Sequence, residues 1–139
     1  MPDRAVEKIL LQLAVSVAAL VPVSAGLAGA IAGPAFISAA ISGAVDLDSH
    51  VRYLSGLLLA IGIGFMSTIP SIERKGRRFR LLTTLVVCGG AARLVSLLVV
   101  GFPGPYMLGG LVMELVVTPS LAAWQARVGA RFDAEMGRA

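Results

Sequence analysis

The chain has 139 residues, of which 57% are hydrophobic and 14% charged, with a mean hydropathy of +0.86 and a formal net charge of +4. Soluble domains carry roughly 25% charged residues, and a single water-soluble domain of this size could not bury so much apolar surface. The composition therefore excludes an ordinary soluble enzyme and a disordered chain, and the single cysteine excludes a disulfide scaffold. It indicates an integral membrane protein small enough to form one bundle.

Four apolar segments follow one another along the chain. Each provides close to the roughly 20 residues that an α-helix needs to cross the hydrocarbon core, and none alternates with the period of a barrel strand. We expect an all-α fold, an antiparallel four-helix transmembrane bundle, in which residues 1–139 form a single membrane domain. The predicted spans cover about residues 9–32, 51–72, 81–101 and 107–128.

Small residues indicate where these helices pack, because membrane helices associate through close backbone approach. The expected rows are Gly26, Gly29 and Gly33 on the first span, and Gly56, Ala60 and Gly64 on the second. Pro22 and Pro119 lie inside spans and each removes a helix hydrogen bond, so we expect kinks there. The connection 33–43 is apolar and uncharged, which predicts an interfacial or re-entrant segment.

Basic residues gather on one side of the predicted spans. They are Arg4, Lys8, Arg74, Lys75, Arg77, Arg78, Arg80, Arg127, Arg131 and Arg138. The connections on the other side contain no Lys or Arg, so the positive-inside rule predicts that both termini are cytoplasmic. Because these charges flank apolar spans, orientation or contact with anionic lipid accounts for them, and no nucleic-acid partner is expected.

Two ionisable residues lie within the third and fourth spans. Arg93 and Glu114 are about 12 Å and about 10.5 Å from the outer ends of their helices, at the usual helical rise. Since the two spans are antiparallel neighbours, an ion pair is geometrically easy, although the third span is apolar enough to tolerate Arg93 alone. Gly89 and Gly110, four residues before each charge, are expected to leave room for it.

The outer end of the second span carries a further polar group. Its members are Asp46, Asp48, His50, Arg52 and Tyr53. An acidic residue or Ser49 is expected to cap the helix, Arg52 to reach toward the interface, and His50 to be either an ordinary interface histidine or a proton relay. We expect the group to share one outer hollow with Arg93 and Glu114. The spacing of His, Cys and acidic residues predicts no metal site and no cofactor.

Several short motifs resemble one family across residues 10–126. They are His50-x-Arg52-Tyr53-Leu54-Ser55-Gly56-Leu57, Gly62-x-Gly64 and Pro70, then Gly89-Gly90-x-x-Arg93-x-x-Ser96, Gly101-x-Pro103 and Glu114-x-x-x-Thr118-Pro119. The pattern resembles the uncharacterised bacterial membrane family called domain of unknown function 4345. The resemblance implies a four-helix, multi-pass protein of the bacterial inner (cytoplasmic) membrane, and it gives weight to Arg52, Arg93 and Glu114. It implies no activity.

Three functions fit these residues. The leading hypothesis is an outward-opening cavity that binds a lipophilic small molecule, such as a terpenoid, sterol or polyketide-like compound. In it Glu114, Asp46, Asp48 and Arg93 are candidate catalytic residues for cofactor-independent isomerisation, cyclisation or epoxide opening. Arg52, His50 and Tyr53 are candidate substrate-binding residues. The alternatives are a proton-linked transporter or channel-like homo-oligomer, and a structural accessory subunit in which Arg93 and Glu114 only join two helices.

Overall fold

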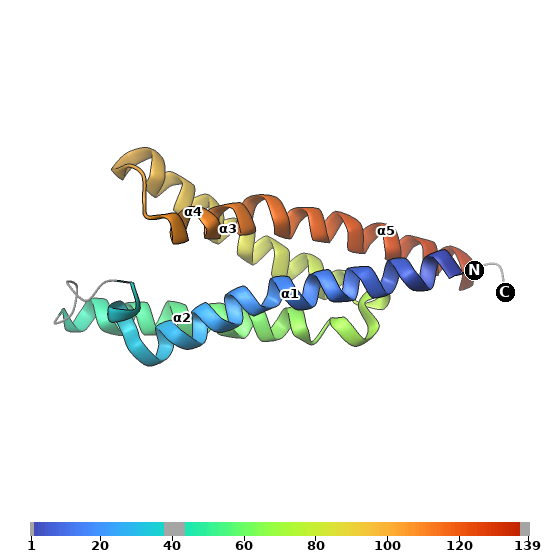
Figure 1. Ribbon diagram of the computed structural model, residues 1–139, viewed down its shortest axis with the longest axis horizontal. Helices are drawn as coiled ribbons and strands as arrows, with labels where there is room; N and C mark the ends of the chain where they lie inside the picture. Colours follow the sequence, from blue (N-terminus) through green and yellow to red (C-terminus); the bar gives the residue numbers. More distant parts are fainter. Residues whose placement is uncertain (1, 38–43, 137–139) are drawn as a thin grey trace. The chain divides into compact units, whose positions relative to one another are not determined.

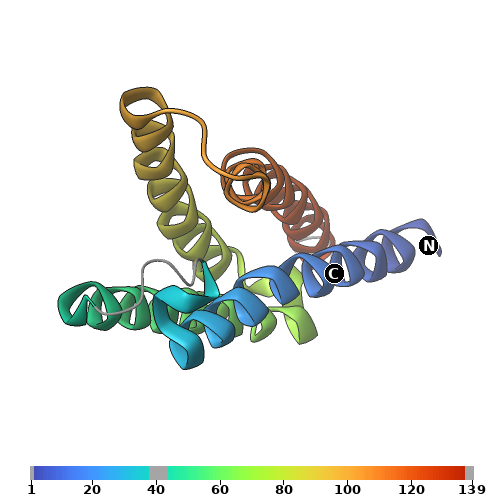
Figure 2. The ribbon, with the colours of Figure 1, turned by 60° about the vertical axis from the view of Figure 1, so that its left-hand side comes forward.

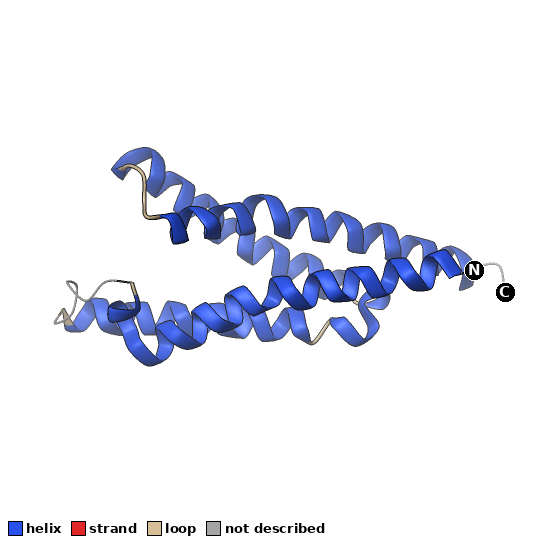
Figure 3. Cartoon of the chain, viewed as in Figure 1, coloured by secondary structure: helices blue, strands red, loops and turns tan. Residues whose placement is uncertain are grey.

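The computed structural model describes residues 2–37 and 44–136, and these residues form helices joined by short loops (Figures 1 and 3). No strand occurs in the described ranges. In chain order the helices are α1 (Pro2–Ala32), the 3-10 helix η1 (Gly33–Phe36), α2 (Val45–Met66), the 3-10 helix η3 (Ile69–Arg74), α3 (Gly76–Val100), α4 (Pro105–Val112), the π-helix η4 (Met113–Val117) and α5 (Thr118–Met136).

Four helical stretches are long and apolar enough to cross a membrane. They are Arg4–Phe36, Val45–Met66, Gly76–Val100 and Pro105–Ala134, the last combining α4, η4 and α5. Many of their large apolar side chains are exposed, as Val17 and Leu98 illustrate at 67% and 73%, which suits contact with lipid tails. The predicted all-α fold with four apolar helices is confirmed. The cytoplasmic location of the termini stays a prediction from charge.

The chain divides into two compact units, and each is described by itself. Unit 1 contains Met1–Val15 and Thr68–Ala139, and unit 2 contains Ser16–Ser67. The first turns of α1 therefore belong to unit 1, whereas the rest of α1 belongs to unit 2 with η1 and α2. That the whole chain forms a single membrane domain stays a prediction.

The second helix is displaced from its predicted span at both ends. α2 begins at Val45 and ends at Met66, six residues before each predicted limit. Acidic residues in its first turn favour the early start, because negative charge stabilises a helix N-terminus. Pro70 disfavours α-helical geometry at the residue before it, which accounts for the early end. The re-entrant segment predicted over 33–43 is described only at its beginning, as η1 and the turn after it; residues 38–43 lie outside the described residues.

The two prolines within spans have different effects. α1 continues as one helix across Pro22, and a kink at this position stays a prediction. Before Pro119 the helix widens into η4, where the Thr118 hydroxyl donates to the carbonyl of Met113 at 2.8 Å. A proline has no N–H to donate and clashes with the carbonyl four residues earlier, and the π segment accommodates both effects.

In unit 2, α1 and α2 pack through glycines. A Cβ at Gly26 would lie 2.5 Å from the Leu59 backbone nitrogen, and one at Gly62 would lie 2.7 Å from the side chain of Val23. The expected glycine row on α1 is thus confirmed. On α2 the expectation is wrong at Gly56, which faces open space, and the contacting face passes through Ser55, Leu59 and Gly62.

In unit 1, α3 and α5 lie side by side and antiparallel, as the views in Figures 1 and 2 agree. Gly76 at the start of α3 lies beside Gln125, whereas Gly90 lies beside Glu114. The side chains of Leu11, Ile72, Phe79, Gln125 and Val128 are fully buried. Within this core Gln125 donates to the carbonyl of Ile72 at 2.8 Å, and this bond satisfies both buried polar groups.

Candidate functional site

The two charges within the third and fourth spans form the expected ion pair. Arg93 of α3 donates from Nε to Glu114 Oε2 at 3.0 Å and from Nη2 to Oε1 at 3.1 Å. This two-pronged arrangement matches the planar guanidinium to the carboxylate, the strongest form of such a contact. The side chains of Arg93 and Glu114 are 34% and 17% exposed, so the guanidinium side of the pair is the less buried one.

Glycines bring the two helices close enough for this pair. A Cβ at Gly90 would lie 2.8 Å from Glu114 Cβ. The close approach of α3 to η4 therefore requires glycine, which has no side chain, at position 90. A Cβ at Gly110 would lie 3.8 Å from the Arg93 guanidinium carbon, which confirms the expected space beside that head group. The same expectation for Gly89 is wrong, since it faces open space and its neighbour Gly90 faces the partner helix.

A methionine completes the surroundings of Arg93. The third guanidinium nitrogen, Nη1, donates to Met107 Sδ at 2.8 Å. A thioether sulfur is only a weak acceptor, so this N–H is poorly satisfied compared with the other two contacts. One helix face carries Met107, Gly110 and Glu114, which are spaced three and four residues apart. This spacing could have indicated from the sequence that Met107 lies beside the ion pair.

The polar group on α2 has a different organisation. Arg52 donates from Nε and Nη2 to the carboxylate of Asp48 at 2.7 and 3.2 Å, and from Nη1 to the carbonyls of Ala30 and Ile31 at 2.9 and 2.6 Å. The last carbonyls of a helix have no partner within it, so Arg52 satisfies the end of α1. Gly33, with φ of 60°, has Asp48 and Arg52 where its Cβ would lie.

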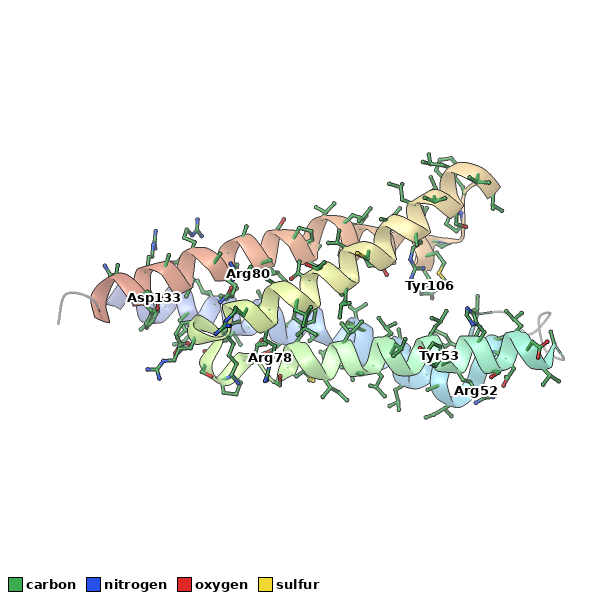
Figure 4. The ribbon with its side chains drawn as sticks, turned by 180° about the vertical axis from the view of Figure 1, so that it is seen from behind. Arg52, Tyr53, Arg78, Arg80, Tyr106 and Asp133 are labelled. Carbon is green, nitrogen blue, oxygen red and sulfur yellow. The ribbon has the colours of Figure 1, made fainter. Side chains whose placement is uncertain are left out.

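The other predicted residues on α2 do not join this arrangement. Asp46 and His50 are exposed, and Tyr53 is 63% exposed near Arg52 (Figure 4). The predicted capping by Asp46, Asp48 or Ser49 is wrong, because the N-cap residue is Ala44 and no side chain bonds there. Arg52–Asp48 belongs to unit 2 and Arg93–Glu114 to unit 1, and their convergence in one outer hollow stays a prediction.

Unit 1 contains an ionic group that was not predicted from the sequence. Glu7 accepts hydrogen bonds from Trp124 Nε1 at 3.3 Å and from Arg131 Nη1, and it pairs with Arg127 Nη2 at 3.2 Å. The three donors are spaced three and four residues apart on one face of α5. This pattern was overlooked because the arginines were interpreted only as determinants of membrane orientation. Figure 4 labels Arg78 and Arg80 of α3 and Asp133 of α5 in the same unit.

A shallow depression of about 430 Å³, largely open to its surroundings, lies beside this group and is called the hollow below. It is lined by Ser120, Ala123, Trp124 and Arg127, all on α5. Among the described residues, no three His, Cys, Asp or Glu side chains gather in a way that could hold a metal ion.

The comparisons with known proteins identify a family. The chain matches the family described as "Domain of unknown function (DUF4345)" over residues 10–125, which is most of its length. The matched region includes Arg52, Arg93 and Glu114. Neither the comparison with curated proteins nor the comparison with solved structures gave a match. The extent of the family match, together with four apolar helices in the described residues, shows that this membrane-type chain belongs to the DUF4345 family.

Proposed function

We propose that this protein binds a lipophilic small molecule through an anionic or carbonyl oxygen at the Arg93–Glu114 pair. The observation that carries the proposal is the contact between Arg93 Nη1 and the sulfur of Met107. A ligand oxygen in place of that sulfur would accept a charge-assisted hydrogen bond, about twice as strong as a neutral one. The Arg93 side chain as a whole is one-third exposed, which is compatible with a ligand beside it.

The same pair supports acid–base chemistry on the bound molecule. A ligand oxygen on Arg93 would have any developing negative charge stabilised by the guanidinium. Glu114 would exchange a proton with a neighbouring carbon or oxygen of the ligand. Isomerisation, cyclisation and epoxide opening are reactions that such a pair would serve, and terpenoids, sterols and polyketide-like compounds are suitable lipophilic substrates.

Binding of oleate tests the proposal, with oleyl alcohol as a neutral compound of the same chain length. We expect the full chain in detergent to bind oleate more tightly, and Arg93→Gln to weaken oleate binding about tenfold or more, since a hydrogen bond to a charged group is lost. Met107→Leu removes the sulfur and keeps the ion pair, so it should strengthen oleate binding about threefold. Arg77→Gln, which removes an exposed arginine from the first turn of α3, is the matched control.

Two results would contradict the proposal. One is equal binding of oleate and oleyl alcohol, unchanged in Arg93→Gln. The other is an unchanged oleate affinity in Met107→Leu, which keeps the Arg93–Glu114 pair and so remains informative if Arg93→Gln does not fold. Either result would favour the alternative in which the pair only joins two helices.

A further inference from the structure

The hollow on α5 is a second feature that the Arg93 site does not use. Its lining residues, Ser120, Ala123, Trp124 and Arg127, are spaced as one face of a helix. At 1.5 Å per residue they extend over about 10 Å along α5. The Ser120 hydroxyl donates to the carbonyl of Val116 at 2.7 Å, so its polar group is directed to the backbone of its own helix.

One end of this hollow is positively charged. Arg127 and Arg131 both contact the single carboxylate of Glu7, so two cations face one anion. The Arg127 side chain is 60% exposed, and a guanidinium has five N–H donors, of which this ion pair engages those of one nitrogen. An additional anion would therefore be attracted to Arg127.

Beyond Ser120, outside the hollow, the surface of the helix is apolar. Val116, one turn before Ser120, is 58% exposed, and Ala123 offers only a methyl group. Trp124 lies between the apolar and the charged ends, and its indole suits the boundary between headgroups and acyl chains. From Arg127 to Val116, over about 16 Å along one helix, a charge is followed by an indole and then by apolar surface. This order is complementary to a lipid rather than to a soluble anion.

We propose that this hollow binds an anionic phospholipid, with its phosphate on Arg127 and the start of an acyl chain along Ala123 toward Val116. The site is distinct from the Arg93–Glu114 pair and does not depend on the function proposed there. Phosphate is well matched to a guanidinium because two N–H groups can contact two of its oxygens. Basic residues at the inner end of membrane helices commonly contact anionic lipid in this way.

Trp124 makes the proposal directly measurable, because it is the one tryptophan of the chain. Brominated acyl chains quench tryptophan emission on contact. The full chain would be titrated in mixed micelles with brominated phosphatidylglycerol, and separately with brominated phosphatidylcholine. We expect half-maximal quenching at about fivefold less phosphatidylglycerol, the preference that one basic residue near a membrane surface provides.

Variants separate a binding site from diffuse surface charge. Arg127→Gln should abolish the fivefold preference, whereas Arg77→Gln, which removes the same charge outside the hollow, should keep it. Ala123→Leu fills the hollow and leaves every charge in place, and it should also abolish the preference. Because Ala123 is exposed, this variant tests the site even if Arg127→Gln does not fold.

Three results would overturn the proposal. The first is equal quenching by the two brominated lipids. The second is a preference that Arg77→Gln reduces as much as Arg127→Gln does, or that Ala123→Leu leaves intact. The third is a Trp124 emission that changes with protein concentration and not with lipid, which would assign the hollow to a second copy of the chain.

Discussion

Arg52 and Arg93, the two arginines in the predicted outer half of the spans, differ in the acceptors that surround their guanidinium groups. Arg52 and Arg93 each make a two-pronged contact with a carboxylate, on Asp48 and Glu114 respectively. The remaining nitrogen of Arg52 donates to two backbone carbonyls, whereas that of Arg93 donates to a thioether. All three nitrogens of Arg52 therefore donate to oxygen acceptors of its own unit, whereas one nitrogen of Arg93 has only a weak acceptor. The difference between the two residues lies in their third contact.

Stability should separate the two pairs most strongly. Arg93→Leu leaves the Glu114 carboxylate, only 17% exposed, without its partner, and we expect a loss of about 3 kcal/mol in the free energy of unfolding. The double variant Arg93→Leu/Glu114→Leu should recover most of that loss, because replacing both charges removes the desolvation cost. Unfolding in mixed micelles with increasing denaturing detergent measures both. Equal losses in the single and double variants would show that the charge itself does not matter.

Neighbouring glycines give the next largest expected effect. Gly90→Ala forces a methyl group against Glu114 and Leu115, and we expect a loss of about 2 kcal/mol from overpacking. Gly89→Ala meets open space and should be neutral or stabilising by up to about 1 kcal/mol, since alanine is the better helix former. The same unfolding assay compares them. Similar losses for both variants would contradict the close approach of α3 to η4.

Ligand binding sharpens the comparison further. Glu114→Gln removes the negative charge that opposes an incoming carboxylate at Arg93, so we expect oleate affinity to rise about tenfold. Asp48→Asn makes the same change beside Arg52, whose three nitrogens all contact oxygen acceptors, and should leave oleate affinity unchanged. Retention of radiolabelled oleate measures both variants. A rise in Asp48→Asn equal to that in Glu114→Gln would mean that the two arginines are equivalent.

The smallest expected effect is local to unit 2. Arg52→Gln withdraws the donors that satisfy the carbonyls of Ala30 and Ile31, so the end of α1 should fray. We expect faster amide hydrogen exchange in the last turn of α1 and no change in α3. Arg52→Lys keeps the charge without the planar fork and should fray the same turn. Unchanged exchange in both variants would remove Arg52 from this role.

Features that depend only on position along a helix axis could be predicted from the sequence. The four helices followed from apolar stretches longer than the hydrocarbon core, and the Arg93–Glu114 pair followed from equal depth on adjacent antiparallel helices. Both depend on distance along a helix axis, which residue number determines directly.

Features that depend on rotation about the axis were harder to predict. Small residues occur on several faces of α2, so the sequence could not distinguish Gly56, which faces open space, from Gly62, which meets Val23. Gly89 and Gly90 were confused for the same reason. The Glu7 contacts were missed because arginines beside spans have a sufficient explanation in orientation, which hides their pairing with a carboxylate more than a hundred residues away.

The π segment Met113–Val117 determines how α4 is rotated about the helix axis relative to α5. A π turn holds one residue more than an α turn, and one residue corresponds to about 100° of rotation. Deleting a single residue from this segment would restore α geometry and shorten the span by only about 1.5 Å. It would also rotate the face that carries Met107 and Gly110 away from Arg93. A one-residue deletion would thus separate Met107 and Gly110 from Arg93 by rotating α4. The length of the span and its amino-acid composition would hardly change.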